Sequence, residues 1–131
     1  MTWFFTGKSS TTAKKFGLHV LEDFMGKPAF LIGQINVKSY PQYLNEYGQP
    51  VFTEATKFGG EFLVATRHAK TLEGEWAGNW TVVIRFPTSE AALAFYDSPD
   101  YAPLREARIE RLSDGGNIVF VEGFDPNPKP G

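Results

Sequence analysis

The sequence contains no cysteine, two histidines and no long apolar run. Without cysteine, a disulfide framework, a thiolate nucleophile and cysteine-ligated zinc or iron–sulfur sites are excluded. The histidines, His19 and His68, lie at unrelated positions and form no HxH or HxxxH pair. We therefore expect no metal site and no other cofactor. No stretch approaches the roughly 20 apolar residues that a membrane-spanning helix needs.

A strong charge of one sign is also missing, since 13 basic and 15 acidic residues give a net charge of −2. This balance predicts neither nucleic acid nor an anionic membrane as a partner. The apolar residues 3–5 are followed at once by Thr6-Gly7-Lys8, which is unlike a signal peptide, so we expect a cytoplasmic protein. Aromatic residues are plentiful, at 15% of 131 residues, and can build a large core.

Four apolar segments of strand length alternate with two helical stretches. The strands are expected near residues 29–36, 60–67, 79–86 and 117–123, the last after a turn at 114–117. The order β-α-β-β-α-β predicts the α+β ferredoxin-like fold, a four-stranded antiparallel sheet with helices on one face.

The first helix follows Ser39 and shows apolar residues at spacings of three and four. We expect a kink or break near Gly48 and Pro50, and an end at Gly59-Gly60. Residues 87–90 open the second helix, which restarts at Ser98-Pro99 and continues to about residue 112. Its arginines, Arg105, Arg108 and Arg111, alternate with Glu106 and Glu110, which is typical of a solvated face.

The strands are apolar on both faces, although the helices can cover only one. A second copy of the chain is the expected cover, because symmetric homodimers are the commonest oligomers. We expect the open face to carry Leu31, Ile35, Val83 and Val119 or Val121, with Arg85 at the interface. Residues 1–28 are the alternative cover.

Three regions are expected: an N-terminal extension (1–28), a ferredoxin-like domain (29–124) and a proline-spaced tail (125–131). Several motifs in the domain occur in order, namely Gly59-Gly60-Glu61-Phe62-Leu63-Val64, Leu72-Glu73-Gly74-Glu75-Trp76, Val82-Val83-Ile84-Arg85-Phe86-Pro87, and above all Ala91-Ala92-Leu93-Ala94-Phe95-Tyr96-Asp97-Ser98-Pro99-Asp100-Tyr101. Through them the chain resembles the domain of unknown function 1330 family, within the dimeric α/β-barrel superfamily. The resemblance implies a ferredoxin-like fold paired into a dimer, and no established reaction.

The chain departs from that family at three places. The segment 63–67 reads Leu-Val-Ala-Thr-Arg where the family tends to read Leu-Val-Arg-Gly-Gly, and Arg85 replaces an expected acidic residue. The extension 1–28 is an addition. The first two changes alter the charge near the sheet, so a ligand common to the family would not transfer directly.

Two residues are candidates for catalysis, His68 and Tyr43. His68 follows the second strand beside Arg67 and precedes Glu73, and an imidazole with a carboxylate can form a general acid–base pair. The alternative is an ordinary solvent-facing loop histidine. If the protein is an enzyme, His68→Ala and Tyr43→Phe should each lower turnover by about 100-fold.

The candidates for ligand binding are mainly aromatic. They are Tyr40, Tyr47, Arg67, Glu73, Trp80, Tyr96 and Tyr101. Phenols at helical spacing can line a cleft and donate to a carbonyl, although the same spacing is typical of a core-facing helix. Tyr96 and Tyr101 flank Ser98-Pro99, where the alternative is a helix junction. Trp80, with Trp76, is expected at the cleft mouth or the dimer interface.

Superfamily analogy suggests a cofactor-free enzyme that acts on a small aromatic or polyketide-like molecule, by acid–base chemistry or oxygenation, in the cleft between sheet and helices. A non-catalytic ligand-binding or stress-associated module is the first alternative, and a purely structural dimer is the second.

Overall fold

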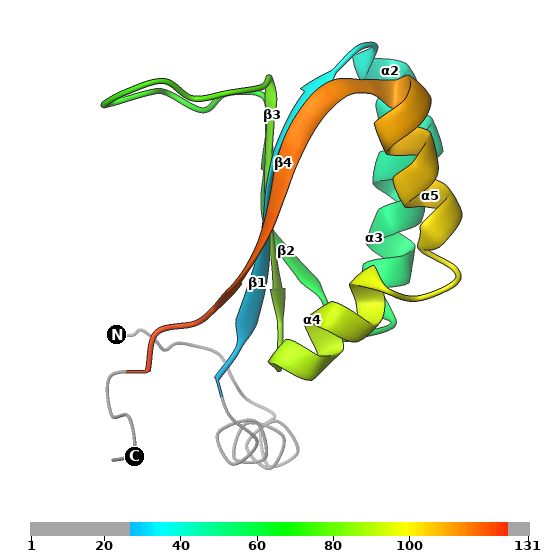
Figure 1. The fold of residues 1–131 in the computed structure, drawn as a ribbon, viewed down its shortest axis with the longest axis vertical. Coiled ribbons are helices and arrows are strands. Elements are labelled where there is room, and N and C mark those ends of the chain that lie inside the picture. The colour runs from blue at the N-terminus through cyan, green and yellow to red at the C-terminus, as the bar shows by residue number, and fades with distance from the viewer. Residues whose placement is uncertain (1–26, 126–131) are drawn as a thin grey trace, which may run out of the picture.

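The computed structural model describes residues 27–125. Nearly all of the expected N-terminal extension (1–28) and C-terminal tail (125–131) therefore lies outside the described residues. The four strands are β1 (Ala29–Val37), β2 (Glu61–Thr66), β3 (Trp80–Phe86) and β4 (Ser113–Glu122). They form one sheet in the order β2-β3-β1-β4, with every neighbouring pair antiparallel. The helices of the described residues all pack on one face of this sheet (Figure 1). The expected ferredoxin-like α+β fold is confirmed.

The first helical segment continues through the position where we expected a kink. It comprises α2 (Tyr40–Tyr43), the π-helical turn η1 (Leu44–Gly48) and α3 (Gln49–Thr56). Pro50 has no N–H to donate to the preceding turn, and the wider turn η1 lies directly before it. The segment ends at Gly59, whose φ of +83° favours glycine.

The second helical segment has three parts: α4 (Ser89–Tyr96), α5 (Ala102–Ala107) and the π-helical turn η2 (Arg108–Leu112). The Thr88 hydroxyl caps α4 by accepting a hydrogen bond from the Ala91 N–H at 3.1 Å. Strand β4 then begins at Ser113, so the expected turn at residues 114–117 was wrong. Gly116 and Asn117 pair with β1, where the absence of a side chain on Gly116 lets the two backbones approach closely. Asp114 and Gly115 lie at a register shift between the pairs Ile35–Gly116 and Val37–Ser113, and Gly115 has a φ of +93°.

The register shows which residues share a face of the sheet. Leu31 lies opposite Ile84, and both are buried against the helices, as is Ile35. The expectation that Leu31 and Ile35 lie on the open face was therefore wrong. Alternation separates the two faces of a strand, but only packing decides which of them the helices cover.

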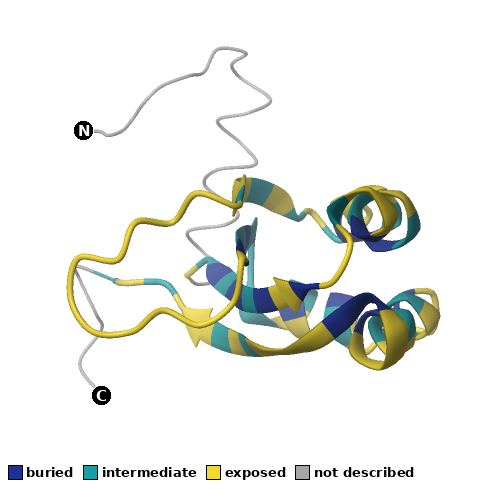
Figure 2. Ribbon diagram, turned by 90° about the horizontal axis from the view of Figure 1, so that it is seen from above, coloured by how far each residue is buried: buried dark blue, intermediate teal, exposed yellow. Residues whose placement is uncertain are grey.

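The open face carries the other set of residues. Ile32 pairs with Val83 on one side and Val119 on the other. Val121 belongs to the same face and, like Val119, is exposed in the single chain. Arg85 also lies here, and its guanidinium is 4.0 Å from the Glu61 carboxylate. Figure 2 shows the exposed positions of this face beside the buried positions that face the helices.

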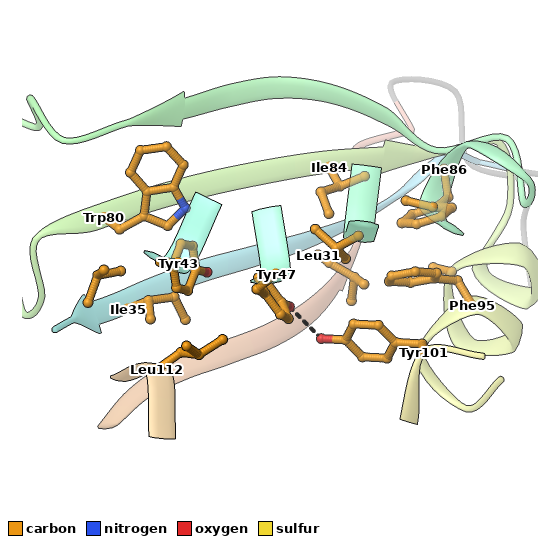
Figure 3. Packing of buried hydrophobic residues seen from close by; sticks show 14 of the residues in the cluster. Leu31, Ile35, Tyr43, Tyr47, Trp80, Ile84, Phe86, Phe95, Tyr101 and Leu112 are labelled. Carbon is orange, nitrogen blue, oxygen red and sulfur yellow. Dashed lines mark hydrogen bonds between the residues drawn. The ribbon is translucent and has the colours of Figure 1, made fainter. Parts of the chain in front are cut away.

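The hydrophobic core lies between the sheet and the helices and is rich in aromatic rings (Figure 3). Phe86 stacks on Phe95 at a centroid distance of 5.5 Å, and Phe95 packs on Tyr101 at 4.6 Å. These contacts join α4 and the start of α5 to the sheet.

A helix with the length and apolar character of a membrane span does not occur among residues 27–125.

Candidate ligand-binding cavity

A cavity of about 540 Å³ lies between the sheet and the helices. This volume is within the range of small-molecule sites, which is about 300–1,000 Å³. Most of the wall is apolar and comes from both layers, with Ile35, Leu44, Val51, Phe62, Val82 and Ile118 among the lining side chains. Among the polar side chains of the wall, Gln49 and Thr53 are exposed, and the buried ones carry phenol hydroxyls.

Three buried tyrosines supply those hydroxyls. Tyr43 and Tyr47 lie in the first helical segment, one helical turn apart, and Tyr101 is the residue directly before α5. The Tyr47 and Tyr101 hydroxyl oxygens are 2.6 Å apart and share a hydrogen bond, drawn as the dashed line in Figure 3. All three side chains point into the space between the helices and the sheet.

Burial controls the ionisation of these phenols. Desolvation raises the pKa of Tyr43 far above its ordinary value of 10.0, and the positive charge of Arg108 offsets only part of this rise. Desolvation also raises the pKa of Tyr47, and proximity to Tyr101 adds to the effect. Both phenols therefore stay protonated at neutral pH, where they serve as hydrogen-bond donors.

Arg108 lies behind the phenols at the start of η2. Only 5% of its surface is exposed, and its guanidinium carbon is 5.6 Å from the centre of the Tyr47 ring. Burial lowers the pKa of Arg108, but interactions with Tyr47 and Tyr101 more than offset it, so the net pKa lies above the ordinary arginine value. The expectation of a fully solvated arginine face was thus wrong at Arg108. Arg111 does fit it, since it is half exposed and contacts Glu46 at 2.7 Å.

Trp80 occupies the end of the cavity near α2. Its indole lines the cavity and packs against Tyr40 with ring centroids 5.3 Å apart. The guanidinium of Arg67 lies 4.1 Å from the centre of the Tyr40 ring. Tyr40 and Arg67 do not line the cavity themselves.

The loop from residue 67 to residue 79 carries His68 and Glu73, and every residue in it is exposed. Figures 1 and 2 show the loop projecting from the sheet on the side opposite the helices. Neither His68 nor Glu73 lines the cavity. Trp76 is half exposed in the same loop, where its indole N–H donates to the Thr81 hydroxyl at 3.1 Å.

The fold thus brings together five of the residues expected at the site: Tyr43, Tyr47, Trp80, Tyr96 and Tyr101. Arg108 could not be recognised as a buried residue from the sequence, because its place among alternating charges is typical of solvent exposure. No sequence signal separates it from Arg105 or Arg111.

Between residues 27 and 125, no group of histidine and carboxylate side chains is placed to hold a metal ion.

The sheet, the helices and the cavity define a ferredoxin-like α+β domain with an aromatic cavity beneath its helices. The chain belongs to the family described as Domain of unknown function (DUF1330), whose sequence model matches residues 28–124.

Solved structures are similar to this chain at low sequence identity. A protein of unknown function from Rhodopseudomonas palustris is 16% identical, with a TM-score of 0.60 over 92% of this chain and 100% of its own. A methylated form of that protein is 14% identical, with a TM-score of 0.61 over 95% and 100% of the two chains. A dimeric ferredoxin-like protein of unknown function from Thermobifida fusca is 16% identical, with a TM-score of 0.44 over 74% and 92%. A search of curated proteins gave no match.

Proposed function

We propose that the protein binds a small, largely apolar molecule in the cavity between the sheet and the helices. The observation that carries this proposal is a space of about 540 Å³ whose apolar wall includes three buried phenols. Such a space accommodates an aromatic ring system, and a few polar groups in an apolar wall are typical of small-molecule sites. The preferred ligand has a hydrogen-bond acceptor that a phenol hydroxyl can reach.

The chemistry of the wall favours binding over acid–base catalysis. Among the lining residues of the described range there is no carboxylate, imidazole or amine. Because burial raises the pKa of Tyr43 and Tyr47, these phenols act as donors and not as bases. A cofactor-free enzyme acting on an aromatic or polyketide-like molecule is the second candidate. It is supported by the same donors, which would stabilise negative charge on a reacting carbonyl oxygen.

A binding experiment with matched variants tests the proposal. Aromatic acids, quinones and short polyketides are screened by thermal shift, and the hits are measured by calorimetry. Removing the hydroxyl with Tyr43→Phe should weaken binding by about 1 kcal/mol, the typical net contribution of one hydrogen bond. Tyr40→Phe is the control, since Tyr40 lies outside the cavity. A screen without hits, or equal effects of the two variants, would contradict the proposal.

Turnover of any hit distinguishes the two candidate functions. Catalytic roles for His68 and Tyr43 stay predictions, and the test is the loss of about 100-fold in rate expected for each variant. If a hit binds but is not consumed, the protein is a binding module. If it is consumed at the same rate by His68→Ala and Tyr43→Phe, neither residue takes part.

We further propose that two copies associate through the open sheet face. Support comes from Phe30, Ile32, Val83, Val119 and Val121, which share this face without helical cover. Apolar side chains that gather on an uncovered sheet face are typical of an interaction site. The loop 67–79 projects from the same side and exposes 85% of Leu72 (Figure 2). The alternative cover remains residues 1–28.

A further inference from the structure

Arg108 is a buried cation that has no counter-ion among the described residues. Its side chain makes no ion pair with any residue from 27 to 125, and its Nε atom has no hydrogen-bond partner there. The groups that interact with its guanidinium are the Tyr47 and Tyr101 hydroxyls. A buried guanidinium whose partners include no carboxylate is rarely kept for stability alone. An anionic group on a bound molecule can therefore supply the missing negative charge.

The backbone around Arg108 gives a second, independent observation. Residues 27–125 contain two π-helical turns, η1 and η2, and they carry Tyr47 and Arg108, respectively. Such turns account for well under 1% of residues in proteins and occur frequently at functional sites. Because both turns contribute a side chain to one cluster, we take this backbone geometry to serve a function.

The cluster of Tyr47, Tyr101 and Arg108 lacks a hydrogen-bond acceptor. Tyr47 and Tyr101 have two hydroxyl hydrogens, and their mutual bond of 2.6 Å uses one of them. The second hydroxyl hydrogen still needs an acceptor. The Arg108 guanidinium cannot supply one, because it carries hydrogen-bond donors only. Because both tyrosines line the cavity, the acceptor that would complete the cluster can come from a molecule bound there.

We propose that this end of the cavity recognises an anionic oxygen on an apolar body, of which an aromatic carboxylate is the simplest case. The Tyr47 and Tyr101 hydroxyls would contact the anion, and Arg108 would act through them as the counter-charge. Arg108 is then a positioning residue, since it does not line the cavity. This inference rests on the proposed binding function and adds the charge of the ligand.

Calorimetry with 1-naphthoate and 1-naphthamide tests the inference, because the two probes match in shape and differ in charge. The wild-type protein should bind naphthoate about tenfold more tightly, the equivalent of 1.4 kcal/mol. Arg108→Met should abolish this preference. Tyr101→Phe, which keeps the ring and the charge, should reduce it. Arg111→Met is the control, since it removes the same charge from an exposed side chain of the same turn and should preserve the preference.

The stability of the free protein supplies a measurement that needs no ligand. Because Arg108 has no carboxylate partner among the described residues, replacing it with the apolar methionine should leave the melting temperature the same or raise it. A lower melting temperature than that of Arg111→Met would make Arg108 a structural residue and overturn the inference. Equal binding of the two probes, or a preference that survives in Arg108→Met, would also overturn it while the proposed function stands. If neither probe binds, the proposed function itself fails.

Discussion

The buried phenols dominate the chemistry of this protein at the scale of single residues. Tyr43 and Tyr101 are each 2% exposed, and Tyr47 is 7% exposed. Tyr43 and Tyr47 pack ring against ring at 5.1 Å. Fully buried tyrosines normally satisfy their hydroxyls within the protein. Among the described residues, only the Tyr47–Tyr101 pair does so. The Tyr43 hydroxyl is consequently the group most directly available to a ligand.

The raised pKa of Tyr43 predicts how stability depends on pH. Above about pH 10 an unfolded tyrosine loses its proton, whereas buried Tyr43 retains it. The folded state then binds more protons than the unfolded state, so the free energy of unfolding falls as pH rises above about 10. Tyr43→Phe should make this fall shallower. Urea denaturation at about pH 9 and about pH 11 measures it.

Val51→Ala is the control for that experiment, because it removes a buried apolar side chain that does not ionise. It should lower stability equally at both pH values. An alkaline loss of stability that is identical in the wild-type protein and in Tyr43→Phe would show that Tyr43 makes no contribution to it.

At the scale of elements, the long loop 67–79 is tied to the sheet at its C-terminal end. The Asn79 backbone N–H donates to the Ile35 carbonyl at 2.9 Å. Its side chain accepts from the Val37 N–H at 2.8 Å and donates to the Val37 carbonyl at 3.0 Å. Asn79 thereby satisfies the backbone of β1 beyond its last pairing with β3, and it delivers Trp80 to the cavity.

Two glycines in this loop give a matched test of its attachment. Gly74 and Gly78 both have positive φ, of +75° and +85°. A Cβ on Gly78 would lie 2.7 Å from the Ile35 carbonyl oxygen, whereas one on Gly74 would meet nothing within 4 Å. Gly74→Ala should cost about 1–2 kcal/mol of backbone strain. Gly78→Ala should cost clearly more, as measured by urea denaturation. Equal losses would mean that the close contact with β1 does not constrain the loop.

At the scale of the whole molecule, the open sheet face predicts self-association. Val83 lies near the middle of this face and pairs with Ile32 and Val64. Val83→Asp would place a charge in an apolar interface without a partner, so it should give a monomer or an aggregate. Sedimentation equilibrium at micromolar concentration measures the outcome, with a dimer expected for the wild-type protein.

Leu93→Asp is the matched control, since Leu93 is 44% exposed on α4 at the helical face of the molecule. It should leave the dimer intact. A wild-type protein that sediments as a monomer would contradict the proposed dimer, and residues 1–28 would then become the expected cover of the sheet.

The sequence alone determined the order of the elements, because strand alternation, helical spacing and the Gly59-Gly60 stop are local properties of the chain. It also indicated Tyr43, Tyr47 and Trp80 as candidate site residues, because large aromatic side chains at these positions can either pack in a core or line a cleft. For the same reason, the sequence could not separate cavity residues such as Tyr47 from packing residues such as Phe86.

Only the tertiary structure decided the questions that depend on contacts between distant segments. Leu31 and Ile35 lie on the face of β1 that the helices cover, so they belong to the core, contrary to expectation. The π-helical turn η2 placed Arg108 beside Tyr47, although its neighbours Arg105 and Arg111 have the same local pattern. Alternation and helical spacing are the same whichever side is covered, so burial and charge at these positions follow from packing and not from local sequence.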